Sequence, residues 1–154
     1  MWQLKTIAAV VSIVWIVAAL SAAQNPARPD DPDARPPVTK ADLRVVERAQ
    51  QILNSSSKWN RADTRRCPAD AKTFSIYCAL ETATKEESGT FEHRGAAMQE
   101  ARFLIEDITR HRDYQHRLMD YNNDPTTTFG DVQRFFALLR KRIDDRLNRE
   151  SSPK

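Results

Sequence analysis

Apolar residues recur at helical spacing in four stretches of the chain after residue 38. The first stretch predicts a helix over 40–54, whose apolar face consists of Leu43, Val46, Ala49 and Leu53. Thr39 and Asp42 have the spacing of a capping box, so we expect this helix to begin just after Thr39. No stretch after the N-terminal segment alternates apolar and polar residues with period two, and the pattern therefore predicts an all-α domain.

Three further helices complete a predicted compact four-helix domain. The second lies within 68–87 and is apolar at six of the seven positions 74–80, which favours a central, buried helix ended by Gly89. The third begins near Phe91 or Glu92 and stops between residues 110 and 115. The last begins after Thr128, which has capping-box spacing to Asp131, and continues to about residue 148.

The predicted third helix has a polar side opposite its apolar stripe. We expect this side to face solvent, and it carries Arg94, Glu100, Arg102, Glu106 and Arg110.

The N-terminal region has the features of an export segment followed by a spacer. Lys5, the apolar run 7–20 and Ser21-Ala22-Ala23 predict a signal peptide over 1–23, cut after Ala23. An uncleaved signal anchor is the alternative, in which residues 7–23 would contact the membrane. Residues 24–38 hold five of the eight prolines and predict a disordered spacer, before a domain over 39–148 and a disordered tail over 149–154. The predicted location is periplasmic or secreted.

Composition excludes several classes of function. The three glycines cannot form a phosphate-binding glycine loop. Cleavage after Ala23 would remove Lys5 alone among the charged residues and leave 23 basic against 21 acidic residues, a surplus too small to predict nucleic-acid binding.

The pairing of Cys67 and Cys78 depends on where the second helix begins. A start at Pro68 would separate the two Cα atoms by about 16 Å, too far for a bond. A start near Ala71, which Asp70 could cap, would let residues 67–72 fold back and the bond form. An oxidising compartment favours pairing, so we expect a disulfide.

Several short motifs occur in an order that resembles a family of small uncharacterised bacterial helical domains. These motifs are Trp59, Cys78-Ala79-Leu80, Tyr121-Asn122-Asn123-Asp124, and the pair Thr127 and Thr128. The resemblance spans residues 43–143 and implies a helical fold with no assigned activity. This chain departs from the family pattern in having an export segment and a second cysteine, Cys67.

One polar cluster is the candidate ligand site. It consists of His116, Asp120, Tyr121, Asn122, Asn123 and Asp124. Asn and Asp side chains before Pro125 can simply build a tight turn, or their oxygens can bind a small ligand or a hard cation. His111 and His116 lie five residues apart, which does not match a zinc motif, so no metal site is predicted.

No arrangement of residues typical of a catalytic site stands out. The sequence therefore predicts a non-catalytic binding or interaction module at the cell envelope, with a protein or an envelope component as its partner and with no cofactor. The alternative is a small metal- or ligand-dependent enzyme or binder that uses His111, His116, Asp120 and Asp124. The oligomeric state stays open.

Overall fold

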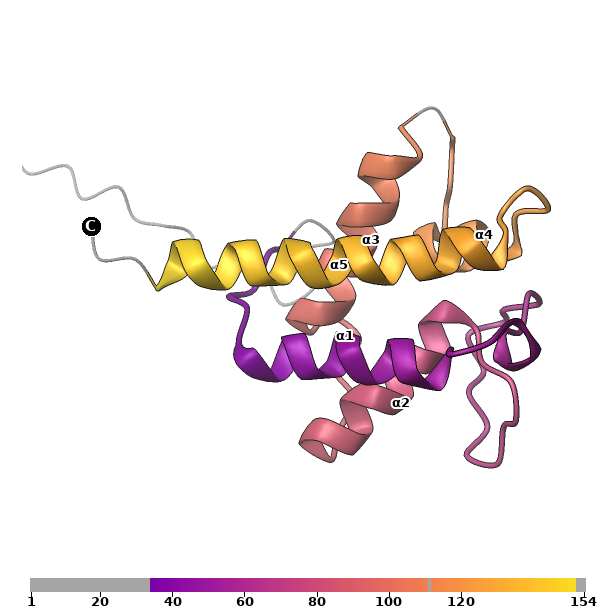
Figure 1. Cartoon of the computed structure of the whole chain (residues 1–154), viewed down its shortest axis with the longest axis horizontal. Coiled ribbons are helices and arrows are strands. Elements are labelled where there is room, and N and C mark those ends of the chain that lie inside the picture. The colour runs from indigo at the N-terminus through magenta and orange to yellow at the C-terminus, as the bar shows by residue number, and fades with distance from the viewer. Residues whose placement is uncertain (1–33, 111, 152–154) are drawn as a thin grey trace, which may run out of the picture.

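The computed structural model describes residues 34–110 and 112–151 (Figure 1). The predicted signal segment, residues 24–33 of the spacer, His111 and residues 152–154 lie outside the described residues. The described chain forms α1 (Lys40–Ile52), the 3-10 turn η1 (Ser56–Lys58), α2 (Ile76–Ser88), α3 (Ala96–Ile108), α4 (Arg117–Asn123) and α5 (Phe129–Glu150). It has no β-strand, which confirms the all-α prediction. No helix in the described ranges is long and apolar enough to cross a membrane.

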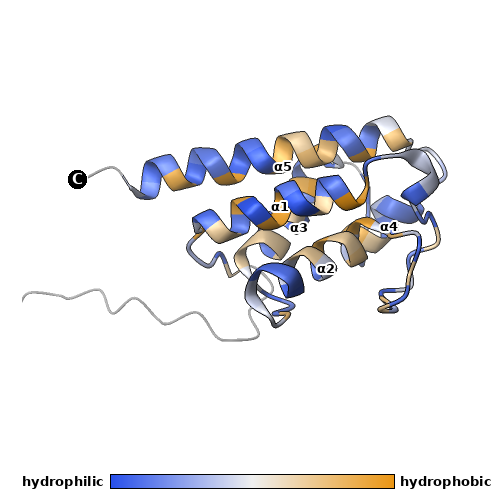
Figure 2. Cartoon of the chain, turned by 60° about the horizontal axis from the view of Figure 1, so that its bottom comes forward, coloured by the Kyte–Doolittle hydropathy of each residue, from blue (hydrophilic) through white to orange (hydrophobic). Residues whose placement is uncertain are grey.

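The helices enclose one hydrophobic core. Figure 1 shows α1 and α5 side by side, with α3 crossing behind α5 and α4 at the far end of the bundle. α2 packs against α1 and is hydrophobic through its first turns, whereas hydrophilic residues cover much of α5 (Figure 2). The centre of the core consists of fully buried Ile76, Leu80, Ile105, Phe135 and Phe136. α2 is therefore central, as its sequence predicts.

The predicted caps of α1, α2 and α5 are present. Thr39 and Thr128 each form a capping box, with Asp42 and Asp131 respectively. Gly89 ends α2 in the left-handed conformation, with φ 76°, which a residue without a Cβ adopts at low cost.

Two predicted helix starts were wrong. α2 begins at Ile76, after Ser75 accepts a hydrogen bond from the Cys78 N–H, and not at Pro68 or Ala71. α3 begins at Ala96, after Gly95, and not near Phe91. In both cases turns occupy the preceding residues. Before α3, the rings of Phe91 and Tyr77 are nearly perpendicular, with their centroids 6.0 Å apart.

The fifth helix, α4, lies where the sequence predicts only a turn. Leu118 and Tyr121, three residues apart, are both buried, and the Tyr121 ring lies 6.1 Å from that of Phe135. The Asp120 carboxylate accepts a hydrogen bond of 2.7 Å from the His116 N–H and so satisfies one free amide at the helix start. Tertiary packing and this local bond make a seven-residue helix from a turn-prone sequence.

Residues 34–38 belong to the folded domain and not, as predicted, to a disordered spacer. Val38 is buried, and its N–H donates to Glu150 over 3.3 Å. The carbonyl oxygen of Ala34 accepts from Gln99 at 2.9 Å, and that of Pro36 accepts from Arg146 at 3.2 Å. The N-terminal arm is therefore fixed against α3 and α5.

Candidate functional site

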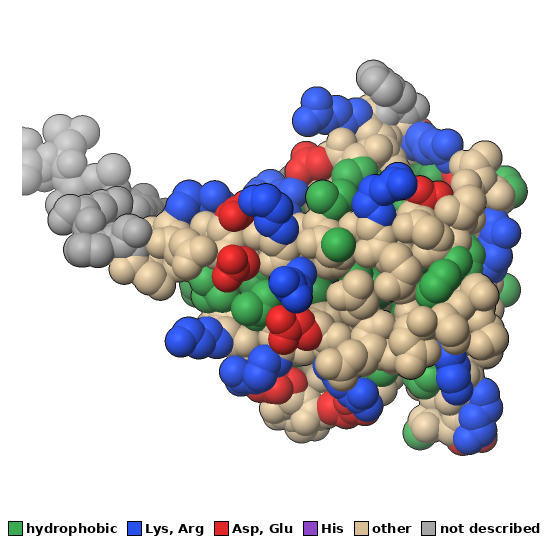
Figure 3. Space-filling view, in the orientation of Figure 1, with side chains coloured by type: hydrophobic (Ala, Val, Ile, Leu, Met, Phe, Trp, Pro, Cys, Tyr) green, Lys and Arg blue, Asp and Glu red, His purple; other side chains and the backbone are tan. Residues whose placement is uncertain are grey.

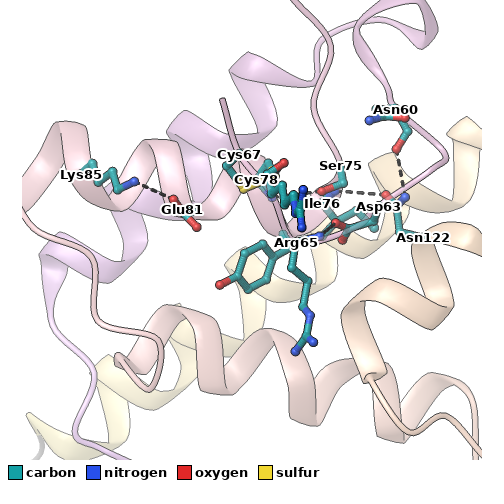
Figure 4. The surroundings of a disulfide bond; sticks show 12 residues. Asn60, Asp63, Arg65, Cys67, Ser75, Ile76, Cys78, Glu81, Lys85 and Asn122 are labelled. Atoms are coloured by element: carbon teal, nitrogen blue, oxygen red, sulfur yellow. Dashed lines mark hydrogen bonds and ion pairs between the residues drawn. A yellow bond between two sulfur atoms is a disulfide. The ribbon is translucent and has the colours of Figure 1, made fainter. Parts of the chain in front are cut away.

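The long loop between α1 and α2 is closed by the predicted disulfide. Cys67 lies in the loop and Cys78 in the first turn of α2, with an S–S distance of 2.07 Å and a Cα–Cα distance of 5.3 Å (Figure 4). The late start of α2 at Ile76 makes this bond possible, because residues 68–75 are free to fold back.

Asn122 joins this loop to α4. Its buried side-chain oxygen accepts from the indole N–H of Trp59 at 2.9 Å and from the backbone N–H of Ile76 at 3.1 Å. Its amide nitrogen donates to the Asn60 carbonyl at 2.9 Å (Figure 4). Asn122 therefore satisfies three groups from two ends of one loop.

Asn123 and Asp124 are also held by contacts within the protein. Asn123 accepts from the Asp63 N–H at 2.7 Å and donates to the Asp63 carbonyl at 2.9 Å. Asp124 accepts from Thr126, from the Tyr114 hydroxyl at 2.6 Å and from Arg112. The Thr126 and Tyr114 hydroxyls, followed by the Thr126 N–H and Arg112, hold the pKa of Asp124 well below its ordinary value.

The polar cluster predicted as a ligand site does not converge on one point. Asn122 and Asn123 face the loop before α2, Asp124 faces Arg112, and Asp120 caps α4. Within 34–110 and 112–151 no group of three or more His, Cys, Asp or Glu side chains is placed to hold a metal. Of the cluster, His116 lines the cavity described next.

A cavity of about 280 Å³ opens between the loop before α2, the loop before α3, α3 and α4. We call it the arginine cavity because Arg65, Arg94, Arg102 and Arg117 line it. His93 and His116 add two titratable groups, and no Asp or Glu of the described chain lies in its wall. Arg117 also pairs with Glu106, at 3.3 Å, outside this wall. A wall with cations and no carboxylate is suited to an anion.

Arg102 lies at the centre of this wall and is held by neutral groups. Its guanidinium donates to the His93 carbonyl at 2.8 Å, to the Gln99 side-chain oxygen at 2.6 Å and to the His93 Nε2 at 2.9 Å. Burial first, and then the charges of Arg94, Arg117 and Arg65, lower the pKa of Arg102 to about 10. An anion in the cavity would relieve this repulsion.

His93 is neutral in this arrangement. One Arg102 nitrogen lies 2.9 Å from its Nε2 and 3.3 Å from its Nδ1, and the Tyr77 hydroxyl lies 3.2 Å from Nδ1. We assign the proton to Nδ1, because the shorter Arg102 contact requires Nε2 to accept, and Nδ1 then donates to Tyr77. Burial, and then the charges of Arg102 and Arg94, lower the pKa of His93 below its ordinary value. The ring therefore positions Arg102 without adding charge.

Arg65 reaches the cavity from the disulfide-closed loop. Its φ of 58° lies in the left-handed region, and its N–H donates to the Asp63 carboxylate at 2.7 Å. Figure 4 shows its side chain extending away from the Cys67–Cys78 bond. Burial raises the pKa of Asp63, whose second carboxylate oxygen has no hydrogen-bond partner. The loop thus uses a strained residue and a buried carboxylate to present one arginine.

The surface across α1 and α5 differs from the arginine cavity. Figure 3 shows basic side chains beside acidic ones on this face, with apolar side chains between them. Arg140 lies 3.8 Å from Glu47, and Lys141 lies 2.7 Å from Asp145. On this face the carboxylates lie among the cations, whereas none lies in the wall of the arginine cavity, so this face offers no comparable anion site.

A buried ion-pair network was missed by the sequence pattern. Glu100, predicted to face solvent, has only 1% of its side chain exposed. It accepts from Arg142 at 2.7 Å and from Arg146 at 2.6 Å, both on α5. Two arginines four residues apart, beside the apolar Ile143, are the signal that could have indicated a buried acidic partner.

The fold and the site define a small all-α domain with one disulfide and an arginine-lined cavity. A family model described as a family of unknown function (DUF6197) matches residues 36–142, and the chain belongs to this family. No curated protein and no solved structure matches the chain. The family match agrees with the resemblance to an uncharacterised domain and assigns no activity.

Proposed function

We propose that the protein is an exported, non-catalytic binding domain that takes an anionic ligand in the arginine cavity. One observation carries the proposal: four arginines and no carboxylate of the described chain line a cavity of about 280 Å³. Guanidinium groups bind oxyanions through charge-assisted hydrogen bonds, often two at a time.

The chemistry of the wall supports binding over catalysis. Guanidinium groups stay protonated at neutral pH, so they hold an anion but do not exchange protons with it. Both ring nitrogens of His93 are engaged, by Arg102 and by Tyr77. The residues that line the cavity therefore orient a charged group.

Export is the second part of the proposal. The apolar run 7–20 and the spacer would carry the domain through the membrane and hold it at the envelope, in the periplasm or after secretion. A disulfide that closes the α1–α2 loop supports an oxidising compartment. An envelope component with a negatively charged group is the expected partner.

A thermal-shift assay tests the binding function. We expect sulfate, pyrophosphate and citrate to raise the melting temperature of the full chain in a saturable way at constant ionic strength, because a ligand of the folded state stabilises it. Arg102→Gln should abolish the shift. Arg140→Gln, which removes the same charge from the α1–α5 face, should retain it. No shift with any anion, or the same shift in both variants, would contradict the proposal.

Mass spectrometry tests the export. We expect the protein recovered from the envelope or the medium of the cells that make it to begin at Gln24, or to retain residues 1–23 if the segment is an anchor. Recovery of the uncut chain from the cytoplasmic fraction would contradict this part of the proposal.

A further inference from the structure

The four arginines of the cavity reach it from four separate segments. Arg65 comes from the loop before α2, Arg94 from the loop before α3, Arg102 from α3 and Arg117 from α4. A carboxylate has two oxygens in one plane. A tetrahedral phosphate group presents three peripheral oxygens in different directions, and donors that surround a cavity match this geometry better.

The charge of the wall also favours a group with more than one negative charge. Arg94, Arg117 and Arg65 all act on Arg102 strongly enough to lower its pKa, so their fields overlap at one place. A phosphomonoester carries close to two charges at neutral pH within one compact group, and the cavity of about 280 Å³ is small.

Tyr77 provides a neutral donor beside these cations. It is 7% exposed, lines the cavity and accepts from the His93 Nδ1–H through its hydroxyl oxygen. Its own O–H proton is thereby directed away from His93 and is available to a ligand oxygen. Phosphate sites in proteins commonly combine such hydroxyl donors with arginines.

We infer that the arginine cavity recognises a phosphate group that carries a free dianionic end, a phosphomonoester or a pyrophosphate. The inference rests on the proposed function and names the ligand class of the same site. Arg102 and Tyr77 hold the phosphate oxygens, and Arg65, Arg94 and Arg117 close around it.

Such a phosphate belongs either to a free solute or to a lipid headgroup. The N-terminal arm passes close to the cavity, because Gln99 lines it and donates to the Ala34 carbonyl at 2.9 Å. Arg35 lies over the Phe103 ring at 3.9 Å, and Arg117 lies over the same ring at 5.6 Å. A domain tethered through this arm would hold the cavity near its tether, so both sources belong in the test.

Isothermal titration with matched anions tests the inference on the full disulfide-bonded chain. The phosphate probes are pyrophosphate and glycerol 3-phosphate, and the carboxylate probes are citrate and succinate, all at constant ionic strength. We expect each phosphate probe to bind at least about tenfold more tightly than the carboxylate of similar charge. Vesicles with phosphatidic acid, compared with phosphatidylserine vesicles, test the lipid source.

Three variants locate the binding. Arg102→Gln should weaken binding of the phosphate probe by about tenfold or more, and Arg102→Lys should also weaken it, since an ammonium group cannot form the paired bonds of a guanidinium. Arg65 is exposed, so Arg65→Gln should leave the fold intact and weaken binding several-fold. Arg140→Gln, on the α1–α5 face, should bind like the unaltered chain.

The outcomes separate this inference from the proposed function. Carboxylates that bind as tightly as phosphates would overturn the phosphate inference and leave anion binding intact. Failure of every probe, soluble or in vesicles, would overturn both. Preference for phosphatidic acid vesicles with no binding of soluble phosphates would support a phosphate headgroup as the source.

Discussion

His93 is the residue through which pH should act on the arginine cavity. The charged and titratable groups that face it are Tyr77, Glu81, Arg65, Arg94 and Arg102. Burial and the arginines hold its pKa below the ordinary value of 6.5. The unfolded chain therefore binds this proton more readily than the folded chain, and the stability present above pH 6.5 is lost as the pH falls through the lowered pKa.

Removal of the His93 imidazole should weaken the pH dependence of both the free energy of unfolding and the affinity for sulfate. Between about pH 7.5 and about pH 5, we expect the free energy of unfolding to fall more for the unaltered chain than for His93→Gln. As the pH falls over the same range, the affinity of the unaltered chain for sulfate, which stays divalent, should rise. A bound anion stabilises the imidazolium, and a protonated His93 no longer accepts a hydrogen bond from Arg102. Urea unfolding and sulfate titration at each pH measure the two effects. Parallel profiles for both proteins would contradict this role.

Asn122 is the residue on which the α1–α2 loop depends most. Asn122→Ala would leave the Trp59 N–H, the Ile76 N–H and the Asn60 carbonyl without their partner. We expect the free energy of unfolding to fall by roughly 2–4 kcal/mol, measured by urea denaturation. The exposed Asn54 is the matched control, and Asn54→Ala should change little. A loss of equal size in both variants would count against this account.

Single-residue roles were only partly predictable from the sequence. The sequence singled out Asn122 and Asp124 as polar and turn-prone, but it did not identify their partners. The partners of Asn122 lie 46 to 63 residues away, and Tyr114 lies ten residues from Asp124. Glu100 was expected in solvent, because helical periodicity identifies a polar side but not a buried ion pair with α5. Long-range polar pairing leaves no periodic signal.

Among the elements, the disulfide-closed loop before α2 should contribute directly to stability. The bond joins residues eleven apart, and such a closure stabilises a fold by about 2–3 kcal/mol. We expect the double variant Cys67→Ser and Cys78→Ser to lose about this much and to bind sulfate more weakly, because Arg65 lies two residues before Cys67. Calorimetry with and without reductant measures the loss. Reductant should not affect the double variant, and an unchanged melting temperature would contradict the prediction.

The contact between α3 and α5 should depend on Glu100. Glu100→Gln removes a buried charge that two partly buried arginines of α5 contact. We expect the free energy of unfolding to fall by roughly 2–4 kcal/mol, since Arg142 and Arg146 then each keep only one carboxylate, Asp107 and Glu150 respectively. Glu47, exposed and 3.8 Å from Arg140, is the control. Glu47→Gln should cost less than about 1 kcal/mol in the same urea titration. Similar costs for both would show that the network is not structural.

The ends of the helices were predictable from the sequence where a local capping signal determines them. The capping boxes at Thr39 and Thr128 and the terminal Gly89 are local, and each lies at the end of its helix. α4 and the late start of α2 were not predictable in this way. Packing of Leu118 and Tyr121 fixes α4, and α2 begins only after residues 68–75 have folded back and brought Cys67 to Cys78.

At the scale of the whole molecule, the all-α class followed from periodicity, but the arginine cavity did not. Its four arginines occupy positions 65, 94, 102 and 117 and share no motif. The small net charge argued against an extended basic surface. A chain with nearly equal numbers of basic and acidic residues can nevertheless concentrate positive charge in one place. Only the arrangement of α2, α3 and α4 brings these residues together.

The most direct measurement follows the arginine side-chain N–H signals by NMR during titration of the full chain with pyrophosphate. We expect saturable shifts of the Arg102 signals and of those of Arg65, Arg94 and Arg117. The signals of Arg44 on α1 and Arg140 on α5, which do not line the cavity, should stay unchanged. Shifts spread evenly over all arginines, or no shift at Arg102, would contradict an anion site in the cavity.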